Sequence, residues 1–429
     1  HGSGKTYRHT TNIIYGEDHY DTQIGITKSH AQKDVVFAEF MKHLKKSGFN
    51  HNLSEKSNKY IVKFTRANGQ QVLCIFGTAD SLMYNIGERK IQGTDCFVDL
   101  VNSIHKFGPT KLQGPKGRFS YAGEKLQANK KTKVIVDEAT MLTEDYANAF
   151  STIMNLCSCD VHLAGDVQQS TLYKKNLLRK IIEEFNTYGN SIPLFSTTVK
   201  VDIVKGNEVR RFNQDLVDWR NEIMRNFIEN PSHNLQIPKP VAAHNVVHER
   251  GIPSIDLIEN IKASDGAESE EIEDSIDIIM AKYIDDAQTY NKLPYHFIII
   301  TPFVKNNPLM DKLQAVIHEY WNIQLNNDEW KDKMQSIYGE EFNQLVSHFE
   351  NMKDGQLDWK CVLHRSEEGK PINTRESIYA TRIVSIHASQ GDGRDIAYVV
   401  GLTERALKRF SGNLIDIQYE SLLNVSISR

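Results

Sequence analysis

The residues best suited to chemistry stand at the start of the chain, in the glycine-rich stretch Gly2-Ser3-Gly4-Lys5-Thr6. They match the second half of the phosphate-binding pattern G-x-x-x-x-G-K-[ST]. In such a loop, backbone N–H groups surround the phosphates, the lysine neutralises them and the threonine hydroxyl binds Mg²⁺. We therefore expect these five residues to bind ATP at the start of a helix, with Thr6 also at Mg²⁺. Because the first glycine of the pattern and its preceding strand are missing, we expect the chain to be a piece of a longer protein.

Two carboxylates follow the apolar run Val134-Ile135-Val136. Asp137 is placed to hold Mg²⁺, and Glu138 to orient and deprotonate an attacking water. Further along, Gly165-Asp166-Val167-Gln168-Gln169 follows another apolar run. The neutral amide of Gln169 can sense a γ-phosphate without adding charge. The alternative for Asp137-Glu138 is a solvated strand end, and the Gly165–Gln169 segment taken alone favours a polar turn over a site. Together with the glycine-rich stretch, the two segments predict nucleotide hydrolysis.

The pattern around these residues predicts strands that alternate with helices, and therefore a parallel sheet that collects ligands at its carboxyl edge. We place a first α/β lobe at residues 1–199, with a polar, irregular insertion at about 49–131, and a second lobe at 200–429. The second lobe is expected to carry an acidic linker at about 264–275 and an inserted subdomain at about 304–375. The expected strands cover residues 23–27, 72–76, 134–138, 161–164, 297–301, 382–386 and 396–400. Helices are expected around Val36-Phe40-Leu44, Tyr146-Ala149-Phe150-Ile153 and Phe212-Leu216-Trp219-Ile223.

Composition places few limits on function. The 429 residues carry a formal net charge of −4, which gives no overall basic footprint but allows a local basic groove. Five scattered cysteines indicate an intracellular, reducing compartment rather than a disulfide framework. No run of apolar residues is long enough to predict a membrane span.

The three segments around Lys5, Asp137 and Gln169 resemble, in this order, motifs I, II and III of superfamily 1 helicases. The likeness continues through Arg211-Phe212, Ile300-Thr301-Pro302-Phe303 (motif IV), Ser385-Ile386-His387-Ala388-Ser389-Gln390-Gly391-Asp392 (motif V) and Leu423-Asn424-Val425-Ser426-Ile427-Ser428-Arg429 (motif VI). Upstream, Ile26-Thr27-Lys28-Ser29 resembles motif Ia and Gly77-Thr78 the Ib region. The sequence around Gly77-Thr78-Ala79-Asp80-Ser81 and Gly391-Asp392-Gly393-Arg394 is similar to that of helicases of large DNA viruses. This similarity would place the protein in the host cytoplasm or nucleus.

The resemblance implies two RecA-like lobes with parallel sheets, each carrying an insertion, and ATP hydrolysis with Mg²⁺ at the cleft between them. It implies catalytic roles for Glu138, Gln169, Arg211 and Arg429, with Gly391 also near the nucleotide. It implies movement along single-stranded nucleic acid, DNA favoured over RNA. The contacts to that strand would come from Thr27, Lys28, Thr78, Thr301, Pro302, His387 and Ser389. A translocase ATPase that does not unwind shares every motif, and a P-loop kinase would use Lys5 similarly but leave the second lobe unexplained.

Overall fold

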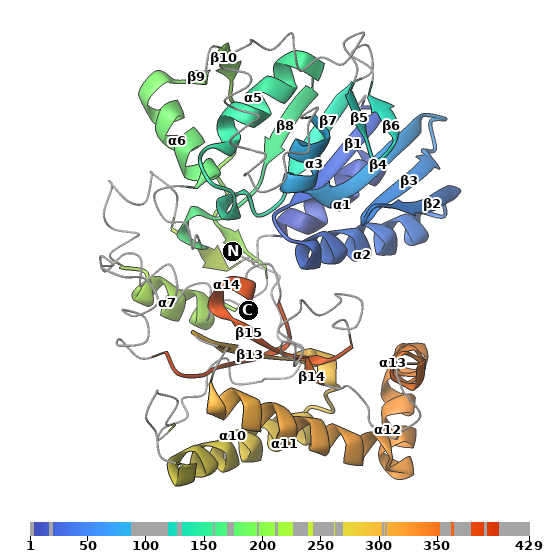
Figure 1. The fold of residues 1–429 in the computed structure, drawn as a ribbon, viewed down its shortest axis with the longest axis vertical. Coiled ribbons are helices and arrows are strands. Elements are labelled where there is room, and N and C mark those ends of the chain that lie inside the picture. The colour runs from blue at the N-terminus through green and yellow to red at the C-terminus, as the bar shows by residue number, and fades with distance from the viewer. Residues whose placement is uncertain are drawn as a thin grey trace. The chain divides into compact units, whose positions relative to one another are not determined.

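A computed structural model describes residues 4–16, 20–86, 119–126, 131–157, 159–169, 176–194, 197–210, 213–225, 239–242, 261, 269–302, 304, 307–351, 362–363, 379–389 and 393–402. The chain divides into two compact units, His1–Glu249 and Arg250–Arg429. Both are α/β units, and Figure 1 labels their elements. Within the described residues, no helix has both the length and the apolar character that crossing a membrane requires.

The first unit is built on a six-stranded sheet with the order β2-β3-β4-β1-β7-β8. Strands β4, β1, β7 and β8 run parallel, whereas β3 runs antiparallel to both of its neighbours. The central strand β1 is buried along its whole length, as expected for a parallel strand covered on both faces. The sheet strands are β1 (Thr22–Thr27), β2 (His51–Lys56), β3 (Lys59–Thr65), β4 (Gln71–Thr78), β7 (Thr132–Val136) and β8 (Cys159–Leu163).

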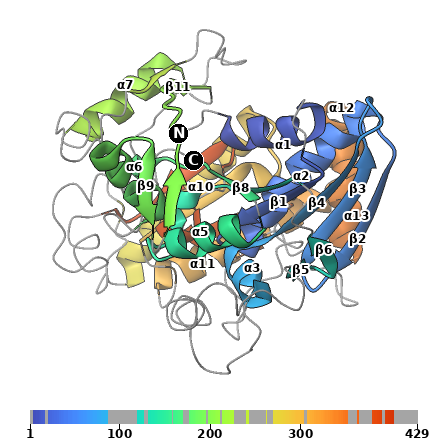
Figure 2. The same ribbon diagram turned by 90° about the horizontal axis from the view of Figure 1, so that it is seen from above.

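Helices cover both faces of this sheet, and Figure 2 shows the strands between the two layers. On one face, α1 (Lys5–Tyr15) and α2 (His30–Ser47) pack Ile14, Phe40 and Leu44 against the sheet. On the other face lie α3 (Ala79–Ile86), α5 (Tyr146–Cys157) and α6 (Leu177–Tyr188), whose apolar side chains share one core with β1 and β7. The hairpin β5 (Phe119–Tyr121) and β6 (Glu124–Leu126) adds the buried Tyr121 to that core.

Short elements complete the first unit. Two 3-10 turns, η2 (Ala139–Met141) and η3 (Val167–Gln169), follow β7 and β8 at the carboxyl edge of the sheet. Strands β9 (Ser191–Leu194) and β10 (Thr197–Lys200) pair antiparallel, and β11 (Glu208–Val209) pairs parallel with β12 (Val241–Ala242). Helix α7 (Gln214–Ile223) lies between β11 and β12 in sequence.

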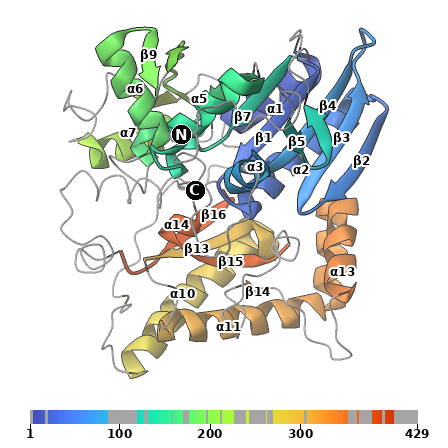
Figure 3. The same cartoon turned by 45° about the horizontal axis from the view of Figure 1, so that its top comes forward.

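The second unit contains a parallel four-stranded sheet with the order β14-β15-β13-β16. The long helices α10 (Ser269–Thr289) and α11 (Pro308–Leu325) cover one face of this sheet (Figure 3). Tyr283 of α10, Trp321 of α11 and Phe297 of β13 pack in one core. The remaining elements are η5 (Pro294–His296), β13 (Phe297–Thr301), α12 (Asp328–Tyr338), α13 (Glu340–Asn351), β14 (Val362–Leu363), β15 (Thr381–Ser385), α14 (Ile386–Ser389) and β16 (Ile396–Val399).

The structure differs from the predicted organisation in the regions called insertions. The stretch 49–78 supplies β2, β3 and β4 of the central sheet, rather than an irregular insertion. In the second unit, α11 packs in the same core as the sheet strands, so it belongs to the layer structure and not to a separate subdomain. Residues 269–275 of the predicted acidic linker form the first turns of α10, where Glu270 and Glu271 suit the positive end of the helix.

The boundary between the units also falls later than predicted, after Glu249 rather than near residue 200. Two hydrogen bonds join described residues after position 200 to the rest of the first unit. The Val201 amide donates to the Asn190 carbonyl at 2.9 Å, and the Arg220 guanidinium of α7 donates to Oε1 of Gln168.

Candidate nucleotide site

Helix α1 begins directly after Gly4, as the phosphate-binding pattern predicts. Gly4 has φ 72° and ψ 28°, a left-handed conformation that glycine adopts readily. Its carbonyl accepts the first helical hydrogen bond, from the Arg8 amide at 2.8 Å. Lys5 and Thr6 therefore occupy the first turn of an eleven-residue helix, whose free N–H groups and dipole favour an anion.

Thr6 and Asp137 meet although 131 positions separate them in the chain. The Thr6 hydroxyl donates a hydrogen bond to Oδ2 of Asp137 at 2.6 Å. The Asp137 amide donates to the Ile26 carbonyl at 2.9 Å, which extends the β1–β7 pairing by one residue and fixes the carboxylate at the edge of the sheet. Its other oxygen, Oδ1, accepts from the Glu138 amide at 3.1 Å.

Glu138 follows in a left-handed backbone conformation, with φ 51° and ψ 48°. This conformation is uncommon for a residue with a side chain and is often found at functional sites. It turns the chain so that Oε1 of Glu138 lies 4.0 Å from Nζ of Lys5, with both side chains largely buried. The second oxygen, Oε2, is buried and has no hydrogen-bond partner among the described residues. A carboxylate oxygen in that position is available to accept a proton or a hydrogen bond from a bound water.

The turn after β8 supplies the predicted sensor residue. Gln169 is fully buried at the end of η3, and its backbone N–H donates to the Asp166 backbone carbonyl at 2.9 Å. The Asp166 carboxylate accepts from the Gln168 amide at 3.0 Å. Burial alone would raise the pKa of Asp166, but the charge of the N-terminal ammonium, followed by those of Arg220 and Lys5, lowers this pKa below its usual range.

Two arginines near these residues were not among the predicted site residues. The guanidinium of Arg220 is buried on α7 and donates to Oε1 of Gln168 and, at 3.1 Å, to Oδ1 of Asn221. Trp219 was predicted to lie on the apolar face of this helix, and that prediction is wrong. Trp219 is exposed, because the buried face of α7 carries Val217, Arg220 and Asn221. Arg210 lies beside Gly4, since a Cβ placed on Gly4 would be 4.0 Å from its Cδ.

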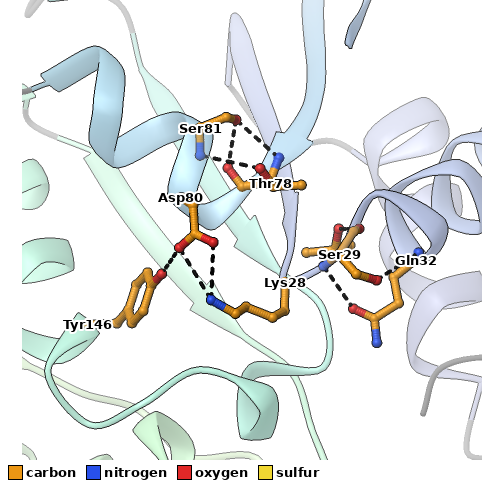
Figure 4. Close-up of polar contacts among 8 residues, drawn as sticks. Lys28, Ser29, Gln32, Thr78, Asp80, Ser81 and Tyr146 are labelled. Atoms are coloured by element: carbon orange, nitrogen blue, oxygen red, sulfur yellow. Dashed lines mark hydrogen bonds and ion pairs between the residues drawn. The ribbon is translucent and has the colours of Figure 1, made fainter. Parts of the chain in front are cut away.

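The predicted strand-contacting residues of the first unit lie at the same carboxyl edge. Thr27 at the end of β1 stands directly opposite Thr78 at the end of β4. Figure 4 shows the next residue, Lys28, with its ammonium on the carboxylate of Asp80. Thr27 and Thr78 are buried, and the Thr27 hydroxyl donates to the Ser29 carbonyl at 2.9 Å. Lys28, in contrast to these two buried threonines, has a partly exposed side chain that carries a charge.

In the second unit, parallel pairing brings the predicted residues to one edge of the smaller sheet. Thr301 at the end of β13 lies opposite Ser385 at the end of β15. Pro302 follows Thr301, and His387 and Ser389 lie on α14, which begins directly after Ser385. The side chains of Thr301 and Ser389 are buried, and the Ser389 hydroxyl donates to the Ile386 carbonyl at 2.8 Å. A nucleic-acid strand bound at this edge would therefore contact the protein backbone more than the hydroxyls of Thr301 and Ser389.

Several predicted site residues lie outside the described part of the chain. They are Gly2, Ser3, Arg211, Gly391 and Arg429, together with the side chain of His387. Their roles stay predictions.

The side chains that the structure brings together fit Mg²⁺ and a nucleotide phosphate. Mg²⁺ prefers oxygen ligands and is commonly held by one or two carboxylates together with substrate phosphates. The Thr6 hydroxyl and the Asp137 carboxylate supply such oxygens, and Lys5 supplies a positive charge beside them. Among the described residues, no group of three or more His, Cys, Asp or Glu side chains could hold a metal on its own. A metal bound at Thr6 and Asp137 would accordingly need the phosphates and water as further ligands.

Comparison with known proteins adds no assignment at this point. No protein-family model matches the chain, and a search of curated proteins finds no relative of significant similarity.

Proposed function

We propose that this chain is the motor core of a superfamily 1 helicase or translocase, which hydrolyses ATP to move along single-stranded nucleic acid. The observation that carries the proposal is the 2.6 Å hydrogen bond between Thr6 and Asp137. It joins the first turn of α1, the helix that begins after Gly4, to the first residue after the buried parallel strand β7. These are the places from which a hydroxyl and a carboxylate can share one metal ion.

The residues around this bond have separate tasks in the proposal. Lys5 neutralises the β- and γ-phosphates, and Gly4 gives the backbone the turn that lets N–H groups face them. Thr6 and Asp137 would hold Mg²⁺, which supplies charge neutralisation on the phosphate oxygens.

Glu138 accepts the proton of the attacking water, because its Oε2 is buried and has no other partner in the described part of the chain. Gln169 reports the γ-phosphate from the neighbouring turn, which Arg220 holds through Gln168. In the proposal, Arg211 and Arg429 add the positive charge that phosphoryl transfer requires.

The nucleic-acid part of the proposal rests on the resemblance and on one further observation. The ends of β1 and β4, where Thr27, Lys28 and Thr78 lie, are on the same edge of the same sheet as Asp137. A strand bound along this edge would therefore lie close to the residues that bind the nucleotide. DNA is favoured over RNA only by the resemblance.

The experiment that tests the proposal is ATP turnover by the full chain. Turnover is measured with and without Mg²⁺, and with single-stranded DNA, single-stranded RNA and duplex DNA. We expect Mg²⁺-dependent hydrolysis that rises several-fold with a single strand. Hydrolysis that no nucleic acid stimulates would contradict the motor function, and strand-stimulated hydrolysis without separation of a duplex would select the translocase.

A further inference from the structure

Lys28 and Tyr146 converge on one carboxylate at the edge of the first unit's sheet (Figure 4). Nζ of Lys28 lies 3.3 Å from Oδ1 and 3.1 Å from Oδ2 of Asp80. The hydroxyl of Tyr146 donates to the same Oδ1. Nζ of Lys28 also lies 5.6 Å from the centre of the Tyr146 ring. An ammonium and a phenol hydroxyl thus hold a two-oxygen anion between them.

Three elements fix this arrangement. Lys28 follows β1 and Asp80 is the second residue of α3, which begins where β4 ends, so both leave the sheet at one edge. Thr78 and Ser81 hold the start of α3, because the Thr78 amide donates to the Ser81 hydroxyl at 3.2 Å and the Ser81 amide to the Thr78 hydroxyl at 3.3 Å. Tyr146 is buried at the start of α5, so packing sets the position of its hydroxyl.

The ion pair itself remains open to solvent. The Lys28 side chain is 38% exposed and that of Asp80 46%. An exposed ion pair adds little to stability, so the carboxylate can turn into water at small cost. A backbone phosphate of nucleic acid also presents one negative charge on two free oxygens. It therefore fits the two donors that now hold Asp80.

We propose that Asp80 competes with nucleic acid within the protein itself. Its carboxylate occupies the two donors, Lys28 and Tyr146, that a backbone phosphate of the bound nucleic-acid strand would use. The inference rests on the proposed function and deepens it. It adds Tyr146 as a contact to the strand and assigns Asp80 the task of weakening that contact. A phosphate that binds Lys28 and Tyr146 must displace the carboxylate, so the strand is held less tightly than the two donors alone would allow.

A purely structural role for Asp80 predicts something different. A carboxylate in the first turn of α3 interacts favourably with the positive end of the helix. If this were its only task, Asp80→Asn would lower thermal stability slightly and leave strand binding unchanged. Affinity and its salt dependence therefore distinguish the two roles.

The test is the binding of a fluorescein-labelled oligothymidylate to the full chain and to its Asp80→Asn variant, followed by fluorescence anisotropy at several salt concentrations. Removing one negative charge about 5 Å from a phosphate should raise affinity roughly fourfold at low salt. The plot of log affinity against log salt should become steeper by about 0.7, because Lys28 then enters binding as an uncompensated cation.

Three further variants define the source of the effect. Asp145→Asn removes an exposed carboxylate next to Tyr146 in the chain, one whose described contact is with Thr143, and should change affinity much less. Lys28→Ala should abolish the gain from Asp80→Asn in a double-mutant cycle. Tyr146→Phe should weaken binding in the Asp80→Asn background. Thermal unfolding of each variant shows that it is folded.

The outcomes separate this inference from the proposed function. If a single strand stimulates ATP hydrolysis but Asp80→Asn binds no more tightly than the parent, or keeps its gain without Lys28, the competitor role is wrong and the motor function stands. If neither the parent nor any variant binds a strand and ATP is not hydrolysed, both fail. A gain that depends on Lys28 and disappears at high salt supports the inference.

Discussion

Arg220 of α7 donates a hydrogen bond to the side chain of Gln168, one residue before the proposed sensor Gln169. The guanidinium is buried and its positive charge interacts with Asp166. This contact joins a helix from residues 214–223 to the turn after β8 in the first unit. It also places a buried positive charge against Gln168, next to the residue proposed to sense the γ-phosphate, Gln169.

Replacing Arg220 should therefore damage the first unit more than a surface substitution would. Arg220→Met removes the hydrogen bonds to Gln168 and Asn221 and takes this cation away from the partly buried Asp166 carboxylate. Removing one partner of buried hydrogen bonds costs about 1–3 kcal/mol. We expect the urea unfolding transition of the first unit to fall accordingly. Arg220→Lys, the control, keeps the charge and should lose less. Equal stability of Arg220→Met and the parent chain would contradict the role of this contact.

Gly77 is a site where even one methyl group should be felt. A Cβ added there would lie 1.9 Å from the Tyr121 hydroxyl and 3.2 Å from Oγ of Ser81. Tyr121 is fully buried, so Gly77→Ala should cost about 1–3 kcal/mol of stability as an overpacked core. Gly206→Ala is the matched control, because nothing lies within 4 Å of a Cβ at that position. Thermal unfolding of the two variants measures the difference, and equal melting temperatures would show that Tyr121 moves freely.

His9 on α1 predicts how the stability of the first unit depends on pH. Burial, together with the positive charges of Lys133 and Lys5, lowers the pKa of His9 from 6.5 to about 4. The folded state thus disfavours the protonated ring, so His9 stabilises folding fully above pH 6.5 and this contribution is lost as the pH falls towards 4. The loss should be on the order of 2 kcal/mol after allowance for solvent screening.

The His9→Asn variant removes this titration. Urea unfolding of the parent and the variant at several pH values between 4 and 7 should therefore show a shallower decline in the variant. Identical slopes would mean that other groups cause the acid sensitivity.

Much of the first unit could be predicted from its apolar patterns. The runs at Val134-Ile135-Val136 and Gln23-Ile24-Gly25-Ile26-Thr27 form β7 and β1, and the Val36-Phe40-Leu44 stripe lies on α2, which ends at Ser47 before Gly48. The place of Asp137 and Glu138 could be predicted because charged residues that follow a buried strand in a parallel sheet must emerge at its carboxyl edge.

The parts that were missed have physical reasons. Strand β2 is almost entirely exposed, so its sequence lacks the apolar alternation that marks a strand. Arg220 was missed because a buried arginine has the same appearance in sequence as a solvated one, and its partner Gln168 is 52 positions away. Lys28 was predicted as a site residue from its motif, but its contacts with Asp80 and Tyr146 depend on the packing of three separate elements.

The proposed role of Glu138 gives the most direct test of the account. Glu138→Gln removes the proton acceptor but leaves Thr6, Asp137 and Lys5 in place. The variant should therefore bind ATP with Mg²⁺ as tightly as the parent chain, while hydrolysis falls by at least about 10²-fold, as expected for the loss of a general base. Equilibrium binding of a fluorescent ATP analogue and phosphate release are measured on the full chain. Tight binding with turnover abolished is the result that the account predicts, and full turnover by Glu138→Gln would contradict it.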